Sequence, residues 1–171
     1  MKSSPKVYIF DLDGTLFYLP IDWEQLFAEF RTIMHVDTVR PLVDTISKLN
    51  QKTRREVFDK WDTAELAVAE NITPCEEGMQ LYRDAEAEGK QKALVTLQGK
   101  RIVKFLVKRF HLEFDVIITR EDSLSRAEQL RIGLKKLNAS AEHALFVGNA
   151  ENDAIAAKKT GCAFHIVTDL K

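Results

Sequence analysis

Short apolar runs alternate with helix-length segments through most of this 171-residue chain. The runs read as strands and cover residues 7–10, 92–96, 114–119, 144–147 and 163–167. Helical spacing or capping patterns cover residues 76–88, 99–110, 125–137 and 152–159. Strands that alternate with helices of this length are joined by right-handed crossovers into one parallel sheet. We therefore predict an α/β fold.

Residues 18–73 have a different character. Asp22 and Gln25 form a capping-box pattern, and apolar residues then recur at helical spacing. Three helices are expected, near residues 22–34, 41–49 and 57–68. Because no strand alternation occurs here, we predict a small all-helical insert over residues 18–73, within a core of residues 1–17 and 74–171.

Composition excludes some partners. The 26 acidic and 25 basic residues leave a net charge of −1, so no global field favours nucleic acid or an anionic membrane. No apolar segment approaches the ~20 residues that span a bilayer, and the N-terminus has no secretory pattern. Cys75 and Cys162 form no CxxC motif, and the histidines have no metal-ligand spacing. We expect reduced thiols and a cytoplasmic protein without nucleic-acid or membrane partners.

Two carboxylates follow the first apolar run directly. Asp11 and Asp13 are one residue apart, so the strand period places them on the same side at the strand's end. Two neighbouring acids are costly unless a cation or substrate balances them. Ligands of parallel sheets bind outside the carboxyl ends of the strands, where Thr96, Thr119 and Asn149 are also expected. This edge is the predicted site.

The motif Asp11-Leu-Asp13-Gly-Thr after a hydrophobic strand resembles the first motif of the haloacid dehalogenase superfamily. The resemblance implies a three-layer, Rossmann-like parallel sheet with a helical cap inserted after the first strand. It also implies that Asp11 is the nucleophile that becomes an aspartyl-phosphate. Asp13 would be the general acid and base, which protonates the leaving alcohol and then activates water.

The second family motif is a Ser or Thr at the end of the next core strand, and Thr96 matches it. The resemblance implies that Thr96 contacts the transferring phosphoryl oxygen. The amides that open the following helix would add positive dipole toward the anion. By the same resemblance, the substrate-binding residues are Gly14, Thr15, Thr96, Leu97 and Gln98.

The third motif departs from the family. A lysine normally precedes the penultimate helix, and alignment of that helix places Leu124 at its position. Arg126 is the nearest replacement, with Arg120 second. Either arginine could instead be a solvated loop residue. A guanidinium binds phosphate through two parallel hydrogen bonds, whereas lysine acts as a point charge.

The fourth motif is also altered. The family's Gly-Asp pair, which holds Mg²⁺, reads Gly148-Asn149 here, although the later Asp153 is kept. The resemblance implies a Mg²⁺ site formed by Asp11, Asp13, Asn149 and Asp153. An amide oxygen adds no negative charge to hold a hard cation, so we expect weaker binding.

Two functional hypotheses follow. The first is a Mg²⁺-dependent phosphatase of small phosphorylated metabolites, with Asp11, Asp13, Thr96 and Arg126 as catalytic residues. The second is a degenerate member of the same superfamily that binds a ligand or partner without efficient turnover, which Leu124 and Asn149 favour. Substrate specificity is expected in the helical insert.

Overall fold

A five-stranded parallel sheet forms the centre of the protein, for which a computed structural model describes residues 3–168. Its strands lie in the order β5-β4-β1-β6-β7, and β1 pairs with both β4 and β6. The strands are β1 (Val7–Phe10), β4 (Gln91–Val95), β5 (Val116–Ile118), β6 (Ala144–Gly148) and β7 (Ala163–Ile166). The predicted parallel α/β fold is confirmed.

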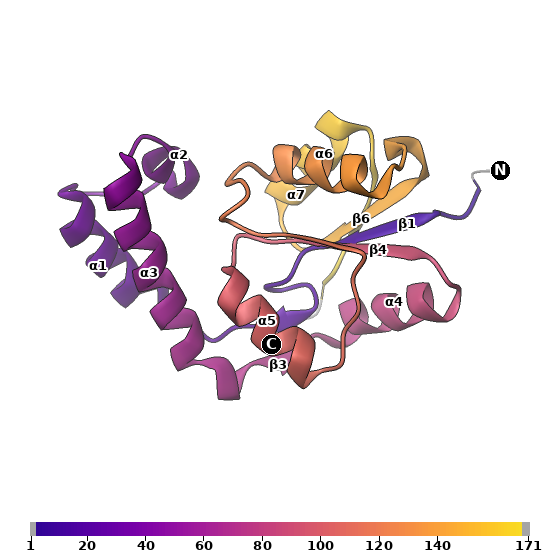
Figure 1. Ribbon diagram of the computed structural model, residues 1–171, viewed down its shortest axis with the longest axis horizontal. Coiled ribbons are helices and arrows are strands. Elements are labelled where there is room, and N and C mark those ends of the chain that lie inside the picture. The colour runs from indigo at the N-terminus through magenta and orange to yellow at the C-terminus, as the bar shows by residue number, and fades with distance from the viewer. Residues whose placement is uncertain (1–2, 169–171) are drawn as a thin grey trace.

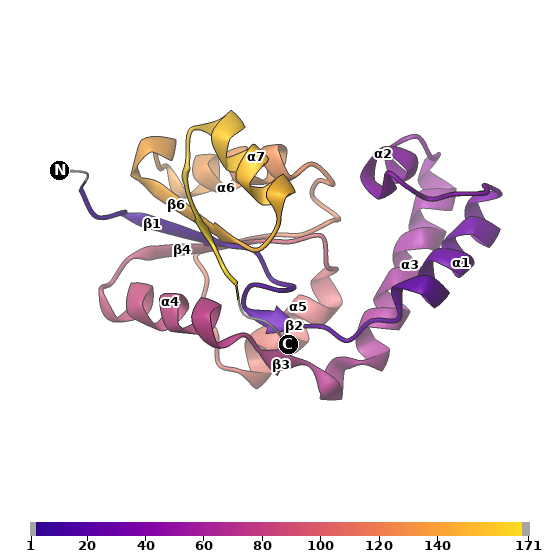
Figure 2. The ribbon, with the colours of Figure 1, turned by 180° about the vertical axis from the view of Figure 1, so that it is seen from behind.

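Helices cover both faces of this sheet (Figures 1 and 2). One face carries α4 (Glu76–Ala87) and α5 (Lys100–Arg109), and the other carries α6 (Arg126–Leu137) and α7 (Glu151–Thr160). Each face has its own apolar cluster, which includes Phe10 and Leu94 on the first side and Ile9 and Phe146 on the second. The alternation of side chains along buried strands produces these two cores.

The helical insert lies to one side of the sheet (Figure 1). It consists of α1 (Trp23–Met34), α2 (Leu42–Ser47) and α3 (Gln51–Ala67), and a 3₁₀ turn, η1 (Ala69–Asn71), follows. Asp22 caps α1 by accepting a hydrogen bond from the Gln25 amide, as the sequence pattern indicates. The insert has its own apolar core, built around Leu26, Phe30, Ile46, Val57 and Trp61. The boundaries at 17/18 and 73/74 stay a prediction.

A second, two-stranded sheet joins the insert to the rest of the chain. Its antiparallel strands are β2 (Phe17–Tyr18) and β3 (Thr73–Pro74). The sequence did not indicate either strand, because strands this short carry no alternation pattern. The pairing brings the two ends of the insert together.

None of the helices in residues 3–168 is both long and apolar enough to cross a membrane.

Candidate active site

The carboxyl edge of the sheet brings the predicted site residues together. Asp11 directly follows β1, Thr96 follows β4, and Asn149 follows β6. Sheet pairing continues into these positions, since the Asp11 amide donates to the Val147 carbonyl at 3.0 Å. The Thr96 amide likewise donates to the Ile118 carbonyl at 3.0 Å, so main-chain bonds of the sheet hold both Asp11 and Thr96.

Asp11 is a buried carboxylate, only 5% exposed. Its Oδ1 accepts a hydrogen bond from Arg126 Nη2 at 3.0 Å, and its Oδ2 accepts one from the Thr15 hydroxyl at 3.4 Å. Burial raises the pKa of Asp11 to about 7, because desolvation disfavours the charged form more than Arg126 favours it. An ionised Asp11 therefore needs further positive charge or donors around it.

Asp13 lies in the turn that follows Asp11. Its Oδ1 accepts the amide hydrogen of Leu19 at 3.1 Å. Burial raises the pKa of Asp13, and hydrogen bonds from the Leu19 and Gly14 amides partly oppose that shift. A carboxyl group whose pKa is raised holds a proton more readily, as a general acid must.

Arg126 links three elements at this edge. It opens α6 just after the cap residue Ser125, and its Nε donates to Asp153 Oδ1 at 3.0 Å. Its Nη1 donates to Gln129 Oε1 at 2.6 Å, and Gln129 Nε2 donates to the Thr96 carbonyl at 2.8 Å. The guanidinium therefore lies between two carboxylates, those of Asp11 and Asp153.

Arg120, the second candidate for the lysine's role, lies elsewhere. Its guanidinium is fully buried and bonds to Asp62 and Glu65 of α3. Arg120 is therefore neither a solvated loop residue nor a partner of Asp11. Sequence spacing could not show this, because the two acids lie more than 50 positions earlier in the chain.

Leu124, which stands at the lysine position, packs against the apolar core of the insert. An apolar side chain at this position thus has a structural use that a charged one could not serve. The guanidinium that is bonded to Asp11 belongs instead to Arg126 on α6.

Asn149 directly follows β6, and Asp153 lies in the first turn of α7. In the orientation that satisfies its hydrogen bonds, the Asn149 amide donates from its nitrogen to the Asp13 carbonyl, 3.3 Å away, and to Asp11 Oδ2, 3.2 Å away. Asp153 Oδ2 accepts the amide hydrogens of Asn149 at 3.2 Å and Ala150 at 3.3 Å. Since its Oδ1 is bonded to Arg126, direct cation binding by Asp153 would displace one of these contacts.

A divalent cation fits this edge in one respect. Rotation of the Asn149 amide by 180° would direct its oxygen, instead of its nitrogen, toward Asp11 Oδ2 and the Asp13 carbonyl. A cation among these three oxygens would then have three ligands. These oxygens are hard donors suited to Mg²⁺, but they carry one formal negative charge between them. Within residues 3–168, no three His, Cys, Asp or Glu side chains form a metal-binding group.

The loop after β4 contains Thr96, Leu97 and Gln98. Thr96 is fully buried, and its hydroxyl bonds to the Gln98 side chain and accepts the Gln98 amide hydrogen at 3.0 Å. We expected the amides that open α5 to face a bound anion, and this expectation is wrong at two positions. The Gly99 amide donates to Glu65, at 3.1 Å, and the Lys100 amide donates to Glu121 Oε2, also at 3.1 Å.

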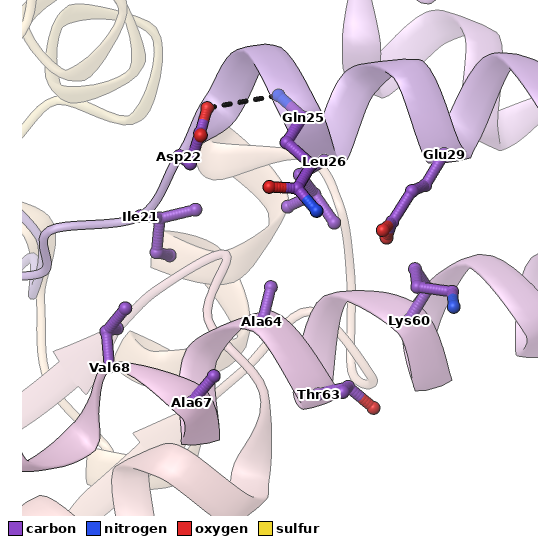
Figure 3. Close-up of a pocket in the computed structure, with 10 residues that line it drawn as sticks. All are labelled: Ile21, Asp22, Gln25, Leu26, Glu29, Lys60, Thr63, Ala64, Ala67 and Val68. Carbon is purple, nitrogen blue, oxygen red and sulfur yellow. Dashed lines mark hydrogen bonds between the residues drawn. The ribbon is translucent and has the colours of Figure 1, made fainter.

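A separate pocket of about 270 Å³ lies between α1 and α3 (Figure 3). Its walls combine apolar side chains such as Leu26 and Ala64 with the polar Glu29 and Lys60. All of its lining residues belong to the segment 21–68, so the pocket is a feature of the insert and not of the carboxylate edge.

The fold and the site define a class of protein: a parallel α/β protein with a carboxylate-rich site at the carboxyl edge of its sheet. The sequence model of the haloacid dehalogenase-like hydrolases matches residues 8–167. The chain belongs to this family and is a hydrolase.

The chain is also similar to named proteins. It is 26% identical to the pyrophosphatase PpaX of Bacillus anthracis, over 90% of this chain and 78% of that protein. The structure of CbbY from Rhodobacter sphaeroides with phosphate has a TM-score of 0.69 and 19% identity, covering 97% of this chain and 87% of that one. A putative phosphoglycolate phosphatase from Lactobacillus plantarum has a TM-score of 0.67 and 16% identity, covering 95% and 86%. These two structures share the fold.

Gly14 offers a test of the Asn149 placement. Gly14 has φ +78°, and a Cβ there would collide with the Asn149 amide, whereas Gly89 has φ +67° and nothing within 4 Å of such a Cβ. We expect Gly89→Ala to cost about 1–2 kcal/mol from backbone strain alone. Gly14→Ala should cost a further 1–3 kcal/mol or so from the collision, measured by urea unfolding. Equal costs would contradict the placement of Asn149.

Proposed function

We propose that the protein hydrolyses phosphate esters of small metabolites through an aspartyl-phosphate on Asp11. The observation that carries this proposal is the buried Asp11 carboxylate, fixed at the end of the central strand by Arg126 at 3.0 Å. The relatives named above, a pyrophosphatase and a protein crystallised with phosphate, support phosphorus as the reacting centre.

Asp11 and Asp13 divide the chemistry between them. A carboxylate oxygen of Asp11 attacks phosphorus, and the bond from phosphorus to the leaving oxygen breaks. Asp13 gives its proton to that oxygen, so the alcohol leaves neutral. The Asp13 carboxylate then takes a proton from water as the water attacks the aspartyl-phosphate. Inorganic phosphate leaves, and Asp11 is restored as a carboxylate.

Arg126 supplies the positive charge that this chemistry needs near Asp11. Phosphoryl transfer depends on positioning and charge neutralisation rather than on complex covalent steps. Arg126 is held by Asp153 and Gln129, so its guanidinium is oriented before substrate arrives. We propose that it replaces the missing lysine. Thr96 would contact the phosphoryl oxygen, with Gly14, Thr15, Leu97 and Gln98 around it.

The cofactor in this proposal is Mg²⁺, which Asp11, the Asp13 carbonyl and Asn149 would hold, with Asp153 as a further contributor through water. A bound Mg²⁺ would neutralise charge on the phosphoryl group. Because Asn149 brings no charge, the chain relies more on Arg126 than a family member with aspartate there would.

The helical insert, residues 18–73, is proposed to be the cap that selects the substrate over the core of residues 1–17 and 74–171. Its place beside the carboxyl edge of the sheet supports this role (Figure 1). The proposed setting is the cytoplasm, since the two cysteines form no CxxC motif and no disulfide framework in the sequence.

Asp11→Asn tests the nucleophile. An amide cannot form the aspartyl-phosphate, so we expect turnover of a generic aryl phosphate with Mg²⁺ to fall below detection. The control Asp84→Asn makes the same chemical change on the exposed side of α4 and should retain full activity. Turnover that survives Asp11→Asn would sink the nucleophile assignment.

Arg126→Met tests the replacement of the lysine. Removing a donor that neutralises developing charge costs roughly 10²–10³-fold in kcat. Arg126→Lys should recover part of that loss, because lysine restores the charge without the fork of donors. Arg131→Met, an exposed change on the same helix, is the control. An unchanged kcat in Arg126→Met would reject the role.

Asn149→Asp tests the metal site and the second hypothesis, a degenerate family member. An added carboxylate should tighten Mg²⁺ binding by about tenfold or more, measured by titration calorimetry. Asn152→Asp adds the same charge at an exposed position of α7 and should not change the affinity. An inactive wild type whose turnover appears with Asn149→Asp would establish the degenerate reading. Unchanged Mg²⁺ affinity would reject Asn149 as a ligand position.

A further inference from the structure

A buried ionic cluster joins the insert to the core. Arg120, after β5, donates from Nη1 to Glu65 Oε2 at 2.9 Å and from Nη2 to Asp62 Oδ1. Its guanidinium also lies over the Trp61 ring, 4.4 Å from the ring centroid. Glu65, like Arg120, is fully buried, and its burial raises its pKa to about 7 despite the arginine. Such a cluster is costly unless every charge is paired.

The cluster also holds the main chain of the loop after β4, residues 96–99. Arg120 Nη1 donates to the Leu97 carbonyl at 3.1 Å, and the Arg120 amide donates to the Gln98 carbonyl at 3.4 Å. The Gly99 amide donates to Glu65 Oε1 at 3.1 Å. Three successive residues of this loop are therefore bonded to Arg120 or Glu65.

Gly99 shows how closely the parts approach. A Cβ at this position would lie 2.7 Å from Arg120 Nη2 and would collide with Asp62 Oδ1. Leu97 adds an apolar contact, since it packs against the apolar core of the insert. The loop is therefore fitted against α3 by main-chain bonds, by an apolar side chain and by the absence of a side chain.

The same loop begins with Thr96, the proposed phosphoryl contact. Its hydroxyl depends on the conformation of the next residues, because it accepts the Gln98 amide hydrogen at 3.0 Å. A shift of the loop would move this hydroxyl relative to Asp11. The insert is thus connected to the phosphoryl site by a short chain of bonds, from Glu65 through Gly99 to Thr96.

We propose that Glu65 and Arg120 are positioning residues, which hold the loop 96–99 in the conformation that binds the transferring phosphoryl group. The proposal deepens the proposed function and rests on it for the identity of the group bound. It makes the seating of α3 against the core a condition for phosphoryl binding, although Glu65 acts only through the loop.

An exposed ion pair between the same two regions provides a matched control. Arg109 of α5 donates to Glu70 of η1 at 2.6 Å, with side chains 42% and 77% exposed. Exposed pairs contribute little to stability. Within residues 3–168, neither side chain of this pair is bonded to the loop 96–99, so Glu70→Gln removes a link between insert and core without touching the loop.

The experiment compares wild type, Glu65→Ala, Glu65→Gln and Glu70→Gln in the presence of Mg²⁺. Affinity for inorganic phosphate is measured by calorimetry, and amide exchange of residues 96–99 by mass spectrometry. Glu65→Ala should weaken phosphate binding by about tenfold or more, as expected for a lost hydrogen bond to a charged group. The amides of residues 96–99 should also exchange faster in Glu65→Ala than in wild type. Glu65→Gln keeps an acceptor for the Gly99 amide, so it should recover part of the phosphate affinity and part of the protection from exchange. Glu70→Gln should match wild type in both measurements.

Three results would overturn the proposal: phosphate affinity in folded Glu65→Ala within about twofold of wild type, an equal loss in Glu70→Gln, or no phosphate binding by wild type. Circular dichroism at the assay temperature establishes folding. Where Glu65→Ala does not fold, Glu65→Gln and Arg120→Lys decide by the same readouts. A wild type that binds phosphate but turns over no aryl phosphate would refute the proposed function and leave this inference to be judged on phosphate binding alone.

Discussion

The charge of one buried carboxylate organises the site. Asp11 directly follows the central strand β1, where its burial raises the cost of ionisation. A protein that keeps an acid there must surround it with donors. Arg126, Thr15 and the Asn149 amide all point at its oxygens. Arg126 in turn requires Asp153, so the beginnings of α6 and α7 are tied to the same carboxylate.

The two departures from the family pattern have related physical consequences. Leu124 places an apolar side chain against the insert where a lysine would stand, and a cation is then found two residues later on α6. Asn149 replaces an acid with a group that can present either a donor or an acceptor to the same point. When its nitrogen faces Asp11 Oδ2, the amide partly offsets the charge of that carboxylate through a hydrogen bond. The first change exchanges one cationic side chain for another, whereas the second places an amide donor of the chain beside Asp11.

The sequence predicted those parts of the fold that depend on local patterns. Strand runs such as 144–147 and caps such as Ser125 are recognisable because burial and hydrogen bonding act on neighbouring residues. The placement of Asp11, Thr96 and Asn149 at one edge also followed, since parallel strands end together. The pairing of β2 with β3, in contrast, depends on residues far apart in the chain and has no local signal. Arg126 was inferred as the replacement for the third-motif lysine because it lies close to that motif in the sequence. Only its contact with Asp11 in the structure distinguishes it from Arg120.

Glu65 shows most clearly where sequence reasoning ends. On α3 it is one acid among many charged residues of a mainly polar helix, although it lies four residues after the buried Trp61 and therefore on the same face. Its burial becomes intelligible only when Arg120 and the Gly99 amide, from two other loops, meet it. Such a cluster gains little stability over an apolar packing of the same volume. Its retention is better explained by the geometry that it imposes: main-chain groups of a loop that begins with Thr96 can be fixed by polar partners, but not by apolar ones. On the positioning role proposed above, the insert contributes to the site through the loop that it orders.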